Sequence, residues 1–362
     1  MDRFAWKDLI ALRMERLCLP AENRPGGTKR LEDYDTLFRD LSPVPTIAWC
    51  APGTPPSLTS HAGFDDEAYN ARRRASRAIL KGRFGSRIAY VAAEDLELYA
   101  CLYRKPLPRL TLAQERMLSL LGREGPMNIG LIKEITGLPV KEITPILHRL
   151  QEAFLVYEDQ VDSEGDRGFY VFESEFPDVD SSRYGRIEAL ERVLPRLARR
   201  MVFLREDAAA EVYGLPLKDI RTALARLGEQ GVLRAVDCGG QIGWMPAEDA
   251  DGWEPQRFEP VRGVLAVQRN SVLMRAEDKM VKASFAGPGE VLCGLLIDGE
   301  IQGVVRGRFK FGPHLLEDVR LSLPAGERID RREEILTAVY RMFDREKSPL
   351  QNYDGIPLQR LS

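Results

Sequence analysis

The chain has 362 residues, of which 44% are hydrophobic and 30% are charged, and its formal net charge is -3 at pH 7. This composition excludes global disorder, and the length suggests two to four domains of roughly 100–150 residues. No apolar run reaches the roughly eighteen residues of a membrane helix, and charged residues interrupt the apolar pattern of the N-terminus, so we expect neither a membrane span nor a signal peptide. The five scattered cysteines lack CxxC spacing, which favours a soluble cytoplasmic protein with reduced thiols.

The N-terminal residues 1–107 are predicted to form a degenerate winged helix. Helical periodicity indicates helices at 4–18, 32–40 and 65–81, and "SRIAYVAAEDLELYACLY" indicates a strand followed by a closing helix. A Pro-rich loop, 42–63, is inserted between the second and third helices. Loops of this length inside a compact domain are usually functional or disordered.

A fourteen-residue phrase occurs twice, as "GLPVKEITPILHRL" from Gly137 and as "GLPLKDIRTALARL" from Gly214. Each glycine is expected to end a short helix, and each proline suits the first turn of the next one. Two helical segments precede each phrase, and a predicted hairpin follows it. Helix, short helix, Gly-containing turn, helix and hairpin make a winged helix. The sequence therefore predicts winged helices at 108–178 and 179–255.

The pattern changes to short strands from about Val261 onward. Asp298-Gly299 marks a hairpin turn between two of them, and "DRREEILTAVYRMF" indicates a closing helix. We predict a small β-barrel or sandwich at 260–362. The predicted fold class is α+β, with three tandem winged-helix units followed by a small C-terminal β-barrel or sandwich and its closing helix.

This order of domains resembles the AlkZ/YcaQ group of winged-helix DNA glycosylases over most of the chain. The resemblance rests on "RIAYVAAEDLELYACLYRKPL", on the two "GLP" helices and on "LLIDGEIQGVVRGRFKF". Members of this group remove alkylated bases and release interstrand crosslinks. The resemblance implies that double-stranded DNA lies against a concave basic surface. It also implies that the wing of the third winged helix, at Gly239, Gly240 and Gln241, reaches into the duplex.

The resemblance implies as well that this chain is a divergent member. The group carries Gln-x-Gln or Gln-x-Asp in the loop after the second helix, where the two polar side chains position the attacking water. The best alignment places Trp49 and Ala51 at these positions, and neither side chain orients water. An aspartate found early in the β-domain of the group aligns with the stretch Arg269-Asn270-Ser271.

Four residues are candidates for a chemical role: Trp49, Cys50, His61 and Asn270. A cysteine and a histidine within hydrogen-bond reach can act as nucleophile and base; the alternative is a semi-buried thiol and an incidental histidine. An aromatic residue such as Trp49 can stack on a flipped base or anchor the loop to a core. No His/Cys/Asp/Glu cluster has metal-ligand spacing and no Gly-rich phosphate loop is present, so we expect no metal and no cofactor.

Basic residues are the candidates for phosphate contact, because such contacts position a duplex without reading its sequence. Solvated helix faces are the alternative for the same residues. One group follows the predicted third helix of the first unit, and the other lies on the third helices of the two winged helices. These residues are Arg72, Arg73, Arg74, Arg77, Lys81 and Arg83, and Lys141, Arg149, Lys218 and Arg221.

Three functions are compatible with these features. The first is a duplex DNA-binding protein, related to alkylated-base or crosslink glycosylases, that binds plain or damaged DNA without hydrolysis. The second is an active glycosylase that flips its base and activates water with another polar group, such as Asn270 or Gln268. The third is a protein-interaction scaffold without nucleic acid, which the near-neutral net charge favours. The missing polar pair favours the first. The sequence does not determine the oligomeric state.

Overall fold

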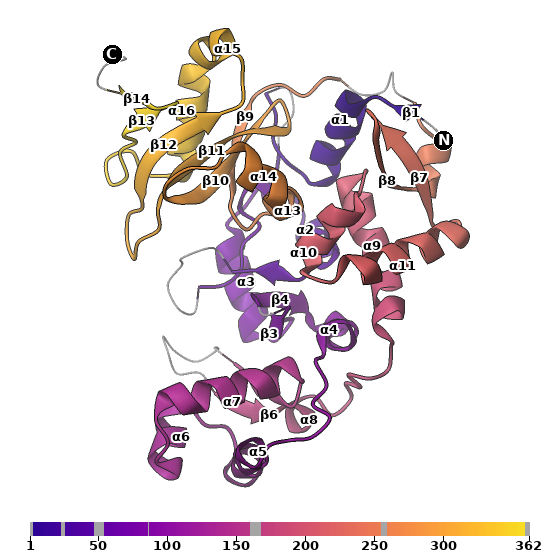
Figure 1. Ribbon diagram of the computed structural model, residues 1–362, viewed down its shortest axis with the longest axis vertical. Helices are drawn as coiled ribbons and strands as arrows, with labels where there is room; N and C mark the ends of the chain where they lie inside the picture. Colours follow the sequence, from indigo (N-terminus) through magenta and orange to yellow (C-terminus); the bar gives the residue numbers. More distant parts are fainter. Residues whose placement is uncertain are drawn as a thin grey trace.

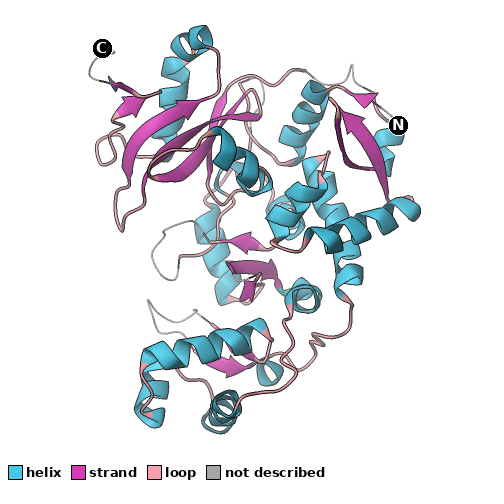
Figure 2. Ribbon diagram, viewed as in Figure 1, coloured by secondary structure: helices cyan, strands magenta, loops and turns pink. Residues whose placement is uncertain are grey.

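The structure, a computed structural model, shows an elongated molecule of the α+β class, with the C-terminal sheet and the 108–178 segment at opposite ends (Figures 1 and 2). None of its described helices is long and apolar enough to cross a membrane. The described residues are 3–22, 26–46, 54–85, 87–159, 168–254 and 259–358.

The N-terminal segment combines helices with a three-stranded sheet in the order β2-β4-β3. The predicted helix at 65–81 is too long, because Arg77 adopts a left-handed conformation (φ 57°) and the chain then enters strand β3. Cross-strand pairing with β4 buries Ile79 and Leu80. The elements are β1 (Arg3–Phe4), α1 (Trp6–Arg16), α2 (Leu31–Asp40), β2 (Val44–Pro45), α3 (Asp66–Ala75), β3 (Ile79–Phe84), β4 (Arg87–Ala92) and α4 (Leu96–Tyr103).

The two copies of the repeated phrase form equivalent structures. Gly137 and Gly214 end α6 and α10 with φ of 68° and 64°, as the sequence predicts. No atom lies within 4 Å of a Cβ built on either glycine, so the backbone conformation, not crowding, favours glycine there. Each phrase then forms a helix and leads into an antiparallel hairpin. The first copy contains α5 (Leu112–Glu124), α6 (Ile129–Thr136), α7 (Val140–Glu152), β5 (Val156–Glu158), β6 (Phe169–Val171) and α8 (Phe172–Glu175). The second contains α9 (Arg186–Met201), α10 (Glu206–Tyr213), α11 (Leu217–Glu229), β7 (Leu233–Cys238), β8 (Gln241–Pro246) and α12 (Ala247–Asp251).

The hydrophobic cores join the two copies to the N-terminal segment to different degrees. Helices α5–α7 and the β5–β6 hairpin enclose a core of their own around Ile132, Ile143 and Leu147. Residues of α1, α4, α9, α10 and the C-terminal region share one large core, which the first copy joins through Phe154, Tyr157 and Phe172. Strand β1 also adds in parallel to β7, a pairing that the sequence did not indicate.

The C-terminal region is one open six-stranded sheet, in the order β14-β13-β12-β11-β10-β9, and not a barrel or sandwich. Closure is not needed, because Ile335 and Val339 of α16 cover one apolar face and Met274 packs among the residues of the other. The predicted turn is present, with positive φ at Asp298 and Gly299. The elements are β9 (Val264–Gln268), α13 (Val272–Ala276), α14 (Asp278–Ser284), β10 (Glu290–Ile297), β11 (Glu300–Arg308), β12 (Leu315–Leu321), α15 (Ala325–Asp330), α16 (Arg332–Met342), β13 (Asn352–Tyr353) and β14 (Ile356–Pro357).

Candidate functional site

The described parts of the Pro-rich loop meet the turn between β9 and α13. The side-chain amide of Asn270 donates from Nδ2 to the backbone oxygen of Thr46 at 2.7 Å. The amide of Gln268 donates from Nε2 to Oγ1 of Thr59 at 2.6 Å. These two bonds connect residues more than two hundred positions apart and bring the loop and the C-terminal sheet together. The predicted candidate Asn270 therefore lies at this junction.

Two cavities lie on either side of Asn270. The cavity beside His61 has a volume of about 30 Å³, comparable to the share of liquid volume of one water molecule. The other cavity, between β2, β4, α10 and the α13–α14 segment, has a volume of about 370 Å³. Small-molecule sites usually measure roughly 300–1,000 Å³. Of these two cavities, the one between β4 and α13 is the one that accommodates a nucleotide-sized group.

His61 has a structural environment. Its side chain is 4% exposed, and its Nδ1 lies 2.6 Å from the backbone oxygen of Leu17, to which it donates since that oxygen only accepts. Burial lowers the pKa of His61, which keeps the ring neutral near pH 7. The proposed partner Cys50, like Trp49 and Ala51, lies outside the described residues. His61 thus serves to hold the Pro-rich loop against the end of α1.

The depressed pKa of His61 predicts that acid destabilises the fold. The unfolded chain binds a proton at this site more readily than the folded chain, so the free energy of unfolding is expected to fall as the pH drops below about 6.5. His61→Gln is expected to lose less stability than the wild type between about pH 7.5 and about pH 5.5. Urea unfolding at both pH values measures this difference. Equal losses in the two proteins would show that His61 does not carry the effect.

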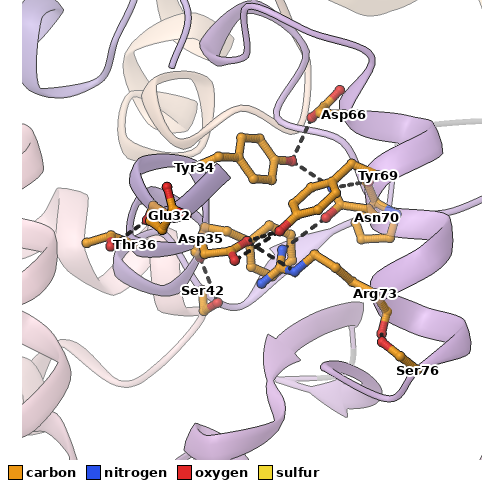
Figure 3. Close-up of polar contacts among 12 residues, drawn as sticks. Glu32, Tyr34, Asp35, Thr36, Ser42, Asp66, Tyr69, Asn70, Arg73 and Ser76 are labelled. Atoms are coloured by element: carbon orange, nitrogen blue, oxygen red, sulfur yellow. Dashed lines mark hydrogen bonds and ion pairs between the residues drawn. The ribbon is translucent and has the colours of Figure 1, made fainter. Parts of the chain in front are cut away.

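Asp66, in α3, connects the second half of the Pro-rich loop to α2 and α3 through hydrogen bonds. Its carboxylate accepts hydrogen bonds from the hydroxyl of Tyr34 at 2.7 Å, from Oγ of Ser57 at 2.8 Å and from the backbone N–H of Leu58 at 2.7 Å. The neighbouring amide of Asn70 donates to Pro56 O and to the Tyr34 hydroxyl (Figure 3). This part of the loop is therefore held by buried polar contacts.

Arg73 belongs to the same network, and its prediction as a DNA contact is wrong. Arg73 is 8% exposed, and its guanidinium donates to Oδ1 of Asn70 at 3.0 Å and pairs with Asp35 at 3.2 Å (Figure 3). The same group lies 4.7 Å from the centre of the Phe38 ring. A guanidinium held in this way stabilises the packing of α3 on α2, because its charge and its planar face are both satisfied inside the protein.

The prediction of Lys81 and Arg77 as DNA contacts is also corrected by the structure. Lys81 is 4% exposed and its Nζ lies 2.9 Å from Glu158, itself 5% exposed. Arg77 is half-buried and pairs with Asp159 and Glu175. Because Ile79–Phe84 is a strand and not a helix, these two side chains point toward the 108–178 segment and connect it to the first sheet. Both cations are therefore engaged in ion pairs within the protein, Lys81 in a buried one.

The other predicted DNA contacts lie at the surface to different degrees. Arg74 and Arg83 are half-buried, whereas the remaining side chains are exposed. Arg149 pairs with Glu152 at 3.7 Å and Arg221 with Glu206 at 2.7 Å. At the tip of the β7–β8 hairpin the two glycines have φ of 60° and 84°. The exposed residues are Arg72, Lys141, Arg149, Lys218, Arg221, Gly239, Gly240 and Gln241.

Two arginines of the larger cavity, Arg87 and Arg275, were not expected to meet: Arg87 ends the basic run "ARRRASRAILKGRFGSR", whose cations were predicted to contact phosphate, and Arg275 was not selected. Arg87 begins β4 and is exposed, whereas Arg275 lies in the short helix α13 and is 9% exposed. An arginine inside the apolar run "VLMRA" is unusual, since arginine is rarely fully buried without a partner, and this was the available signal. No group of three His, Cys, Asp or Glu side chains suited to a metal ion occurs in the described part of the chain.

Comparison with known proteins gives a clear result for the fold. No family model and no curated protein sequence matches this chain. The solved structure of the Streptomyces sahachiroi DNA glycosylase AlkZ superposes with a TM-score of 0.64 and covers 97% of this chain and 100% of its own, at 15% sequence identity. The chain has the fold of AlkZ. The predicted resemblance to the AlkZ/YcaQ group is thereby confirmed for the fold.

Within the AlkZ fold, the Pro-rich loop lacks the residues that the resemblance leads us to look for. Residues 41–63 include no Asp, Glu, Asn or Gln. The Gln-x-Gln or Gln-x-Asp pair is therefore missing from this segment in every alignment register, not only in the one that selects Trp49 and Ala51. Asn270 and Gln268 are amide side chains that the C-terminal region contributes to the junction, and Asn270 lines both cavities.

Proposed function

We propose that the protein binds duplex DNA on an AlkZ-like scaffold and does not hydrolyse the glycosidic bond. The observation that carries this proposal is an AlkZ fold along 97% of the chain together with a Pro-rich loop free of acidic and amide side chains. Hydrolysis needs a positioned group that accepts a proton from the attacking water. DNA binding needs none, because phosphate contacts and groove shape supply most of the affinity.

We further propose that 108–178 and 179–255 act as winged helices, flanked by the degenerate unit 1–107 and the β-domain 260–362. Supporting this division, three helices precede a hairpin in each copy. The exposed Lys141 and Lys218 occupy the first turns of α7 and α11, where the third helix of a helix-turn-helix meets DNA. The exposed Gly239-Gly240 turn is the corresponding wing tip.

An active glycosylase is the second candidate, and Asn270 is the observation that favours it. Asn270 lines both cavities, and its side-chain oxygen accepts no hydrogen bond from a described residue. This oxygen can orient a water molecule. The motif of the group, however, positions the water with two polar side chains, whereas Asn270 supplies one and the Pro-rich loop supplies no acidic or amide side chain. This difference makes the binding function the better supported one.

Fluorescence anisotropy and a base-release assay separate these candidates. The wild type is expected to bind a labelled duplex and to lose affinity steeply between about 50 and about 200 mM salt. It is expected to release no alkylated base above the uncatalysed rate. Base release would establish the glycosylase and reject the proposal as stated. Failure to bind plain, alkylated or abasic duplex at the lower salt concentration would reject both, and the fold would then serve protein partners.

A further inference from the structure

The larger cavity is positively charged. Its lining includes the cations Arg87, Arg269, Arg275 and Lys282 and the acids Glu211 and Asp278. It lies where β4, α10, α13 and α14 converge near the centre of the molecule (Figure 1). Ligand sites occur preferentially at such junctions between structural units.

The two acids of the lining are already paired. Asp278 accepts from Arg269 and from Lys282, and Glu211 pairs with Lys279 at 2.9 Å. Arg87 and Arg275 therefore face the cavity without a carboxylate partner among the described residues. Among the residues that the structure describes, Arg87 reaches the backbone oxygen of Glu211 at 3.5 Å, which is a weak contact.

Arg275 lines the buried inner side of this cavity. One of its nitrogens, Nη1, donates to the backbone oxygen of Val212 at 3.0 Å, while its buried Nε has no hydrogen-bond partner among the described residues. Burial, and then the positive charge of Arg87, lower the pKa of Arg275 to about 10. A buried cation next to a second cation costs stability unless an anion joins them. Strongly perturbed groups of this kind cluster at functional sites.

We propose that this cavity binds the phosphate of a nucleotide, with Arg275 at its inner wall and Arg87 at its rim. Guanidinium groups suit phosphate because their parallel N–H donors match two of its oxygens. The apolar side chains of Pro45 and Ile88 line the same cavity and provide a surface for the sugar or the base. The nucleotide is either free in solution or flipped out of a DNA duplex. Only the DNA source rests on the proposed function.

The test compares ligands and variants of the full-length chain by isothermal titration calorimetry. The probes are deoxyadenosine monophosphate, inorganic phosphate and uncharged deoxyadenosine. We expect the monophosphate to bind at least about tenfold more tightly than deoxyadenosine, and Arg87→Gln to lower its affinity by about tenfold or more, since charge-assisted hydrogen bonds are lost. Arg275→Met is expected to abolish the preference for the monophosphate. Arg116→Gln, an exposed arginine of α5 at the far end of the molecule, is the matched control and is expected to bind as the wild type.

Anisotropy with plain and abasic duplexes identifies the source of the phosphate. A DNA source is supported if Arg87→Gln weakens binding to the abasic duplex more than to the plain one. A free-nucleotide source is supported if calorimetry shows Arg87-dependent binding and both duplexes bind Arg87→Gln and the wild type equally.

The inference is overturned if no phosphate-bearing probe distinguishes Arg87→Gln from the wild type. Salt-dependent duplex binding would then leave the proposed function standing. Conversely, Arg87-dependent nucleotide binding without any duplex binding would uphold the inference and reject the proposed function. Because Arg87 is exposed, its variant gives this answer even if Arg275→Met fails to fold.

Discussion

Lys81→Met is expected to lower the free energy of unfolding by about 3–5 kcal/mol, because it removes the cation that lies beside the buried carboxylate of Glu158. The two side chains are 4% and 5% exposed and lie 2.9 Å apart. Glu158 also accepts from Nε2 of Gln151 at 2.7 Å, but a neutral amide does not compensate a buried charge. The measurement is urea unfolding followed by circular dichroism, at a pH near 7.

Two further variants separate the buried charge from the loss of a side chain. Lys81→Met combined with Glu158→Gln removes both charges and is expected to recover most of the stability, since replacing both members of a buried pair is often nearly neutral. Lys105→Met is the matched control: its ammonium pairs with Glu152 at 3.1 Å but is half-exposed, and the expected loss is about 1 kcal/mol or less. A loss in Lys81→Met no larger than in Lys105→Met would contradict the assignment of a buried pair between β3 and β5.

The success of the sequence analysis at the repeated phrase has a local cause. Helix ends, the left-handed glycine and the apolar stripe are all determined within about fourteen neighbouring residues, and Ile143, Leu147, Ile220 and Leu224 are indeed buried. The prediction from local periodicity is wrong at 76–84, where three arginines and lysines resemble a solvated helix face. The left-handed Arg77 and the pairing of β3 with β4 depend on contacts that no local period reveals.

The candidate site was only partly accessible for the same reason. Asn270 was selected because the resemblance placed it near the family's aspartate, and it does lie at the junction with the Pro-rich loop. The cation-lined cavity was missed because Arg87 and Arg275 are far apart in the sequence and meet only after β4 and α13 pack around α10. Burial also changed the meaning of single residues: Arg73, in an arginine run, became a structural ion pair.

Replacing Lys141 and Lys218 by glutamine is expected to weaken duplex binding and to flatten its salt dependence. Both side chains are exposed, on the first turns of α7 and α11, which suits contact with the DNA backbone. Each phosphate contact contributes about 0.9 to the slope of log K against log salt, so the double variant is expected to lose about 2 from that slope. Because phosphates carry no sequence information, plain and abasic duplexes are expected to lose affinity equally.

The control for this variant is Arg345→Gln, which removes an exposed cation that follows α16 in the C-terminal region, at the end of the molecule opposite to α7 (Figure 1). It is expected to leave the slope unchanged. If the double variant also keeps the wild-type slope while the wild type binds duplex, the third helices do not contact phosphates, and the contacts must come from other exposed cations such as Arg72. If only the abasic duplex loses affinity, the lysines contribute to recognition of the distorted site and not to phosphate contacts that both duplexes share. The loss of slope, shared by both duplexes, is therefore the result that assigns α7 and α11 to the DNA surface.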